Sequence, residues 1–144
     1  MRKLIPLTLA AVLAAAPLHA ASNDEVAARN LALLTAGAFA NDGFKLRDGN
    51  WMGTLEPGKP KLIQVNLYAG NQYWFTLGAT GAAKKLAVTI FDETGKALET
   101  LPYEKEDGTV VAAGFAPEAS GSYYIRLAEV EGTPSAFCLI YSYK

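Results

Sequence analysis

The stretch that decides the fold reads Leu67-Tyr68-Ala69-Gly70-Asn71-Gln72-Tyr73-Trp74-Phe75-Thr76-Leu77. A turn at 69–71 divides it, and beyond the turn Tyr73, Phe75 and Leu77 alternate with other residues. Successive side chains of a β-strand point to opposite faces of a sheet, so this period of two is typical of a strand with one buried side. The stretch therefore predicts a turn followed by a strand whose apolar row needs a covering layer.

The same alternation of apolar and other residues recurs through most of the chain. Turns rich in Gly, Pro, Asn and Asp separate the alternating segments. Strands are expected near residues 51–55, 61–67, 73–77, 86–90, 109–115, 123–127 and 136–143. The chain shows no alternation of strands with helices. We therefore predict a mainly β fold, an antiparallel β-sandwich of about seven or eight strands. Its expected core includes Phe75, Val88, Ile90, Phe115, Ile125 and Leu139.

Residues 1–20 have the features of a secretory signal peptide. The basic start Arg2-Lys3 precedes an uncharged apolar run over 4–16, which is too short to span a bilayer comfortably. The segment ends in Leu18-His19-Ala20, which is similar to the A-x-A pattern that signal peptidase recognises. We predict cleavage before Ala21 and a mature protein that is periplasmic or secreted and has no membrane insertion.

A short α-helix is expected between the signal and the strands. The motif Ser22-Asn23-Asp24-Glu25 resembles a capping box, and the Ala- and Leu-rich segment to about Ala40 favours helix. We expect Val26, Leu33 and Leu34 to form the face that packs on the following domain. The predicted organisation is thus a signal peptide (1–20), an N-terminal helical segment (21–43) and a β-sandwich domain (44–144).

Composition argues against several classes of function. Without Arg2 and Lys3, the 13 basic residues fall to 11 against 14 acidic ones, a net charge of −3 that does not favour nucleic-acid binding. The only histidine is His19, inside the predicted signal, so the mature chain has no imidazole for a nucleophile–base pair or a zinc site. Cys138 is the only cysteine and is expected to be buried. We predict no enzyme activity, no catalytic residues and no cofactor.

Acidic loop residues leave one alternative open. The carboxylates available to a calcium ion are Asp92, Glu93, Glu104, Glu106 and Asp107. They show no ordered ligand pattern such as that of an EF-hand loop. We therefore expect them to be solvated loop charges, with no metal bound. Glu104 and Glu106 could also suggest the paired carboxylates of a glycosidase, but we expect them to be solvated loop charges as well.

Three segments together resemble a known bacterial domain. They are the aromatic strand 67–75, the strand 86–98 that contains Asp92-Glu93-Thr94-Gly95, and the run 115–127 with Pro117-Glu118-Ala119-Ser120-Gly121-Ser122-Tyr123-Tyr124. Over residues 51–143 the chain is similar to the bacterial pre-peptidase C-terminal (PPC-like) domain. That resemblance implies a jelly-roll-like β-sandwich of the kind usually appended to secreted peptidases, although here only a short helix precedes it.

Three residues are candidates for a ligand-binding surface. Trp74, Tyr124 and Arg126 are out of phase with the two clearest apolar rows, so they are expected to point outward and to share a face. Exposed aromatic rings beside an arginine suit recognition of sugars or protein groups. The competing account is that segment 22–40 covers these residues and makes them packing contacts.

The sequence therefore predicts a binding or accessory module that presents a sandwich surface to a protein or glycan of the cell envelope or exterior, without turnover. The alternative is a structural or assembly component of the envelope that docks a partner through its N-terminal helix.

Overall fold

The computed structural model describes residues 22–81 and 83–144, so the predicted signal peptide lies outside the described residues. One helix, α1 (Asn23–Ala40), precedes nine strands. The strands are β1 (Lys45–Leu46), β2 (Trp51–Leu55), β3 (Lys61–Leu67), β4 (Tyr73–Ala79), β5 (Ala83–Asp92), β6 (Leu101–Glu104), β7 (Val110–Phe115), β8 (Gly121–Gly132) and β9 (Ser135–Tyr143). The expected mainly β fold is confirmed.

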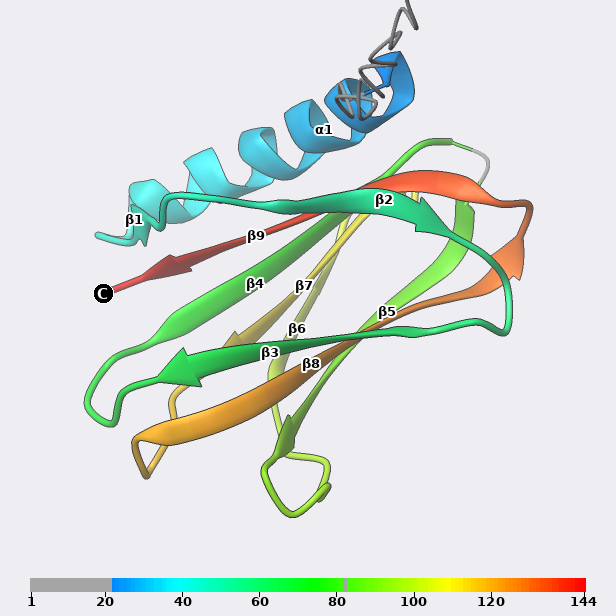
Figure 1. Cartoon of the computed structure of the whole chain (residues 1–144). Helices are drawn as coiled ribbons and strands as arrows, with labels where there is room; N and C mark the ends of the chain where they lie inside the picture. Colours follow the sequence, from blue (N-terminus) through cyan, green and yellow to red (C-terminus); the bar gives the residue numbers. More distant parts are fainter. Residues whose placement is uncertain (1–21, 82) are drawn as a thin grey trace, which may run out of the picture.

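The strands form two antiparallel sheets that face each other (Figure 1). In the six-stranded sheet the order is β1-β9-β4-β7-β6. Strand β2 also pairs with β9, along Ser135 to Leu139, whereas β1 pairs with Ser142 and Tyr143. In the three-stranded sheet the order is β3-β8-β5. Strands β2 and β3 follow each other in sequence but lie in different sheets. The chain therefore crosses between the layers there and leaves an open edge between them.

The core lies between the sheets and is built from the alternating apolar rows. Phe75 and Leu139 from the six-stranded sheet are fully buried, as are Ile90 and Ile125 from the three-stranded sheet. Of the other two expected core residues, Val88 and Phe115 are partly buried and pack against the same cluster. The phase predicted for these strands is therefore confirmed.

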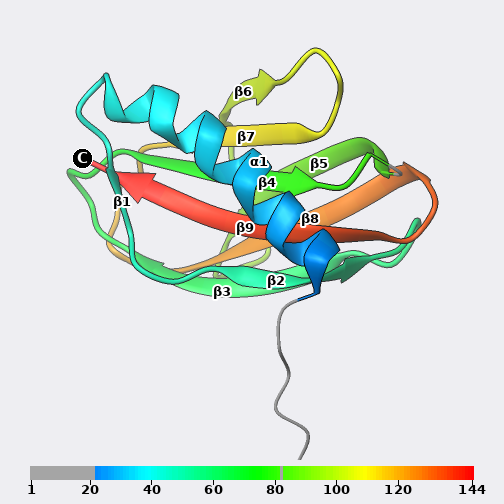
Figure 2. The same ribbon diagram turned by 90° about the horizontal axis from the view of Figure 1, so that it is seen from above.

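Helix α1 lies on the outer face of the six-stranded sheet and runs across β9 and β4 (Figure 2). It begins where the capping motif predicts, because the Ser22 hydroxyl accepts a hydrogen bond from the Glu25 amide at 3.1 Å. It ends in the turn before Gly43, whose φ of +91° suits a residue without a side chain. The helix thus adds a third layer on one side of the sandwich.

The buried face of α1 matches the expected one only in part. The helix packs through Ala28, Ala32 and Ala36. Of the three residues expected there, Leu33 is partly buried and packs against this cluster, whereas Leu34 is 75% exposed and Val26 is 44% exposed. The reason is the sheet beneath it: a Cβ on Gly78 of β4 would lie 2.5 Å from the Ala28 carbonyl oxygen. Helix and sheet backbones meet so closely that only small residues fit between them.

Cys138 lies in this interface and is fully buried, as predicted. Burial raises the pKa of its thiol to about 11, so the thiol stays protonated near neutral pH. Its neighbours are apolar: the alanines of α1 and Ile140. Cys138 therefore acts as a packing residue.

Two strands were not expected from the sequence. Strand β1 is only two residues long, and β6 contains Pro102. Proline cannot donate to a β-ladder and is tolerated at sheet edges, which is where β6 lies. All four residues of β6 are exposed, so no apolar alternation marked it.

Within the part of the chain that the structure describes, no helix combines the length and hydropathy that a membrane crossing requires.

Candidate functional site

Trp74 points outward from β4, as predicted, but α1 covers it. Its ring stacks on Phe39 of the helix, with centroids 4.4 Å apart and planes at 5°. On the sheet side its ring lies over Gly114, where an added Cβ would come within 3.0 Å of it. Trp74 is half-buried and belongs to a small cluster with Phe39, Phe44 and Ala112. It is a packing contact that seats the helix, as the competing account from the sequence proposed.

Tyr124 and Arg126 also point outward, but from the opposite side of the molecule. Both lie on β8, the central strand of the three-stranded sheet, while their neighbours Tyr123, Ile125 and Leu127 face the core. The prediction that they share a face with Trp74 is therefore wrong. Alternation shows on which side of a strand a residue lies, whereas strand pairing decides to which sheet that side belongs.

Strand register places partners on both sides of these two residues. Tyr124 lies between Gln64 of β3 and Phe91 of β5. Arg126 lies in the next outward row, between Leu62 and Thr89. Arg126 is exposed and Tyr124 is half-buried. Directly opposed side chains in antiparallel strands are close enough to act together, so these rows form one continuous surface.

We call this surface the open face. Its residues are Leu62, Gln64, Asn66, Thr89, Phe91, Ser122, Tyr124 and Arg126. One end is organised by hydrogen bonds: Gln64 Nε2 donates to Ser122 Oγ, which donates to Asn66 Oδ1, both at 3.3 Å. Helix α1 lies on the six-stranded sheet, and none of the described elements covers the outer side of the three-stranded sheet (Figures 1 and 2).

The open face carries one strong charge. Arg126 takes part in none of the ion pairs found among residues 22–81 and 83–144. A guanidinium without a carboxylate partner presents planar donors that match an incoming carboxylate or polar group. The face therefore combines an aromatic centre, amides and hydroxyls at one end, and a free cation.

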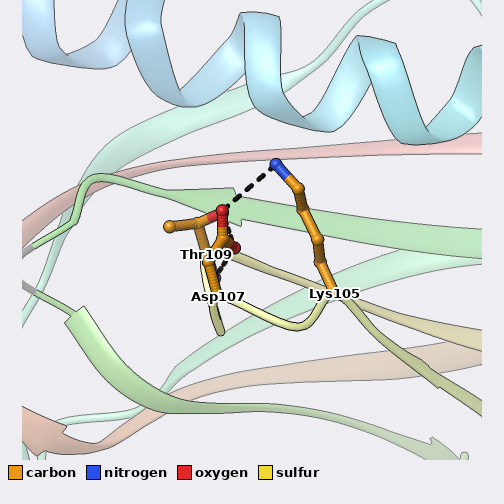
Figure 3. A network of polar contacts seen from close by, with 3 residues as sticks. All are labelled: Lys105, Asp107 and Thr109. Atoms are coloured by element: carbon orange, nitrogen blue, oxygen red, sulfur yellow. Dashed lines mark hydrogen bonds and ion pairs between the residues drawn. The ribbon is translucent and has the colours of Figure 1, made fainter.

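Two of the loop carboxylates, Asp92 and Asp107, are hydrogen-bonded within their own turns, as Figure 3 shows for Asp107. Asp107 Oδ1 accepts hydrogen bonds from the Thr109 hydroxyl at 2.6 Å and the Thr109 amide at 3.0 Å, and Lys105 Nζ lies 3.2 Å from Oδ2. The Thr109 hydroxyl bond is the largest cause that lowers the pKa of Asp107 to about 2. This carboxylate is thus an ionised acceptor that closes the turn between β6 and β7.

Asp92 repeats the arrangement after β5. Its Oδ1 accepts from the Thr94 hydroxyl at 2.6 Å and from the amides of Thr94 and Lys96 at 2.9 and 3.0 Å. The Thr94 hydroxyl bond leads the causes that lower the pKa of Asp92. Among the described residues, no three His, Cys, Asp or Glu side chains converge in a way that could hold a metal ion.

Two hollows open at the strand ends. The end groove, of about 950 Å³, is acidic, since Asp92, Glu93, Glu99 and Glu118 line it. The edge pocket, of about 550 Å³, is aromatic, since Trp51, Tyr68, Tyr73, Tyr141 and Tyr143 line it. Both volumes fall within the range of roughly 300–1,000 Å³ that is typical of small-molecule sites.

Sequence reasoning missed Gln64 and Phe91 on the open face, and it missed the edge pocket. Gln64 and Phe91 are out of phase with the apolar rows of their own strands, and that signal is visible in the sequence. Their position beside Tyr124 is not, because it depends on pairing between strands far apart in the chain. The pocket residues come from several separate strands and loops and follow no local pattern.

The structure thus defines the class of molecule: an antiparallel β-sandwich with one helix-covered sheet and one open sheet. Comparison of the sequence with protein-family models and with curated proteins found no match.

Proposed function

We propose that the protein is an exported, non-catalytic binding module whose open face holds a glycan chain of the cell envelope or exterior. The observation that supports this most directly is the uncovered three-stranded sheet, on which Tyr124 lies between Gln64 and Phe91 beside the unpaired Arg126. The sandwich holds these side chains on regular strands, so little conformational entropy is lost when a ligand binds.

The chemistry of the face favours a glycan over a protein segment. Aromatic rings pack against the C–H faces of sugar rings, and amides both donate to and accept from hydroxyl groups. Gln64, Asn66 and Ser122 supply such groups along one end of the face. Neither of the two hollows described above is lined by Phe91, Tyr124 or Arg126, whereas a protein hot spot typically fills a well-packed pocket.

The absence of turnover is supported by the sequence. The mature chain contains no histidine, and the loop carboxylates Asp92 and Asp107 are engaged in their own turns. Export is supported by the signal features of residues 1–20. The resemblance to the PPC-like domain is consistent with an accessory role outside the cytoplasm.

Co-sedimentation with insoluble polysaccharides tests this function. Purified protein is mixed with peptidoglycan sacculi, chitin or cellulose, and the bound fraction is measured. Tyr124→Ala combined with Arg126→Gln should abolish binding with little change in Tm, because both side chains point away from the core. Arg29→Gln is the matched control: it removes the same charge from α1, on the other sheet.

Two results would contradict the proposal. One is retention of binding by the double variant, and the other is failure of the parent protein to bind any of the three polysaccharides. A fall in Tm of many degrees with binding preserved at low temperature would assign Tyr124 and Arg126 to packing.

A second candidate function is assembly in the envelope through α1. The observation that favours it is the exposed side of the helix, where Leu34 is 75% exposed and Val26 is 44% exposed. Leu34→Ser would then abolish co-purification with an envelope component and leave polysaccharide binding unchanged.

A further inference from the structure

The edge pocket lies where the two sheets separate. Strand β2 pairs only with β9, and β3 pairs only with β8, so the adjoining edges of the two layers have no ladder between them (Figure 1). Trp51 enters the pocket from β2, Val65 from β3 and Tyr141 from β9. The pocket is therefore held by strands on both sides.

Aromatic side chains make up half of the ten residues that line the pocket. Trp51 stacks on Tyr141, with ring centroids 6.0 Å apart and planes at 14°. Tyr141 is buried at the base, whereas Tyr68 is 62% exposed and Tyr143 is 38% exposed. The rings thus extend from the core to solvent, which suits a ligand that enters with an apolar face against them.

Among the described residues that line the pocket, Arg47 is the only charged one. Its guanidinium carbon lies 5.0 Å from the centre of the Tyr141 ring, and its backbone amide donates to the Tyr141 carbonyl at 3.0 Å. Contact with an aromatic ring and an anchored backbone restrict where the guanidinium lies. None of the ion pairs among the described residues uses Arg47, so its planar donors are available to a carboxylate.

The remaining polar groups match hydroxyls. The Tyr73 hydroxyl accepts from the Tyr68 amide at 2.9 Å and from Asn71 Nδ2 at 3.2 Å, which leaves its own hydrogen free to donate. A tyrosine hydroxyl carries its proton at neutral pH, so Tyr141 supplies a second donor, and burial shifts its pKa further upward. Side-chain amides of Gln64 and Asn66 lie at the rim.

The charge of this pocket is opposite to that of the other hollow. No Asp or Glu lines the edge pocket, whereas four line the end groove. An anion is therefore favoured in the edge pocket and disfavoured in the groove. A purely apolar acid would leave the Tyr73 hydroxyl hydrogen without an acceptor, which costs free energy, so a ligand with hydroxyl groups as well as a carboxylate fits better.

We propose that the edge pocket binds a sugar ring that carries a carboxylate, a uronic acid unit, with the ring against Trp51 and Tyr68 and the carboxylate on Arg47. This site is separate from the glycan surface on the open face. The two sites share Gln64 and Asn66, but Tyr124 and Arg126 do not line the pocket and Arg47 is not on the open face. Variants at these three residues therefore test the two sites separately.

The test uses trisaccharides of galacturonate, mannuronate and guluronate, with the methyl ester of the galacturonate trisaccharide as an uncharged control. Binding is measured by calorimetry and by the change in tryptophan emission on titration up to about 10 mM. At least one acid should bind saturably and more tightly than the ester. Arg47→Gln should weaken binding of that acid by about tenfold or more and leave binding of the ester nearly unchanged.

Lys45→Gln is the matched control, because Lys45 is a nearby exposed cation in β1 that does not line the pocket. It should leave affinity for the acid unchanged. The open-face variant Tyr124→Ala with Arg126→Gln should also leave it unchanged. The proposal is overturned if no acid binds, if acid and ester bind equally, or if Arg47→Gln and Lys45→Gln weaken binding to the same extent.

Discussion

Replacing Gly78 with Ala tests the contact that joins the helix to the sandwich. The added Cβ would lie 2.5 Å from the Ala28 carbonyl oxygen, 2.9 Å from the Ala32 amide nitrogen and 3.2 Å from the Ala32 Cβ. Two of these three atoms belong to the backbone of α1, so no side-chain rotation relieves the overlap. The helix has to move outward by roughly 1 Å to restore ordinary contacts of about 3.5 Å.

The cost follows from that movement. Overpacking of a tight interface typically costs about 1–3 kcal/mol, and the better strand propensity of alanine offsets about 0.5–1 kcal/mol of it. The displacement also loosens the Phe39–Trp74 stack, whose centroids are 4.4 Å apart. We expect a net loss of about 1–2 kcal/mol in the free energy of unfolding, which lowers the urea midpoint by roughly 0.5–1 M.

The assay is urea unfolding followed by tryptophan fluorescence and far-ultraviolet circular dichroism. Gly37→Ala is the matched control, because Gly37 lies in the same helix with no atom within 4 Å of an added Cβ. It should stabilise the protein by up to about 1 kcal/mol, since alanine is the better helix former. The reasoning is refuted if Gly78→Ala leaves the urea midpoint unchanged, or if both variants shift it in the same direction.

Three further predictions address the core, a buried carboxyl group and export. Ile125→Ala should cost about 2–5 kcal/mol in urea unfolding, because Ile125 is fully buried; a loss below about 0.5 kcal/mol would mean that the inward row is wrongly phased. Glu129 is 2% exposed, and burial raises its pKa more than the nearby Ser135 hydroxyl lowers it. The folded protein therefore holds this proton more tightly than the unfolded chain and loses stability as pH rises through the raised pKa. Glu129→Gln should have the higher urea midpoint at pH 7, with the advantage shrinking toward pH 4; equal midpoints at pH 7 would contradict this. Exported protein should start at Ala21, and an intact mass that includes residues 1–20 would disprove the predicted cleavage.

Local patterns in the sequence determined most of the secondary structure. The period-two rows through Phe75, Ile90 and Ile125 predicted the strands and their buried sides, because a strand with one wet face must alternate. The Ser22 capping motif predicted the start of α1, because it depends only on residues three apart in the chain.

The helix face shows where local pattern was insufficient. Bulky apolar residues usually mark the buried side of a helix, and that rule selected Val26, Leu33 and Leu34. Leu33 does pack against the sheet, but Val26 and Leu34 are exposed. The sheet beneath α1 presents Gly78, so close approach of the two backbones buries alanines instead. The residues that form the surface beneath a helix lie elsewhere in the chain, so the helix sequence alone does not show which of its sides is buried.

The candidate site was likewise predictable only in part. The sequence by itself determined that Trp74, Tyr124 and Arg126 point away from their strands' apolar rows, because alternation is a property of each strand alone. Only the tertiary structure decided that α1 covers Trp74 while the other two lie on an open face, and that Arg47 meets Trp51 and Tyr141 in a pocket. The physical reason is that strand pairing and layer packing join residues far apart in sequence, and their free energy comes from surfaces that no single segment contains.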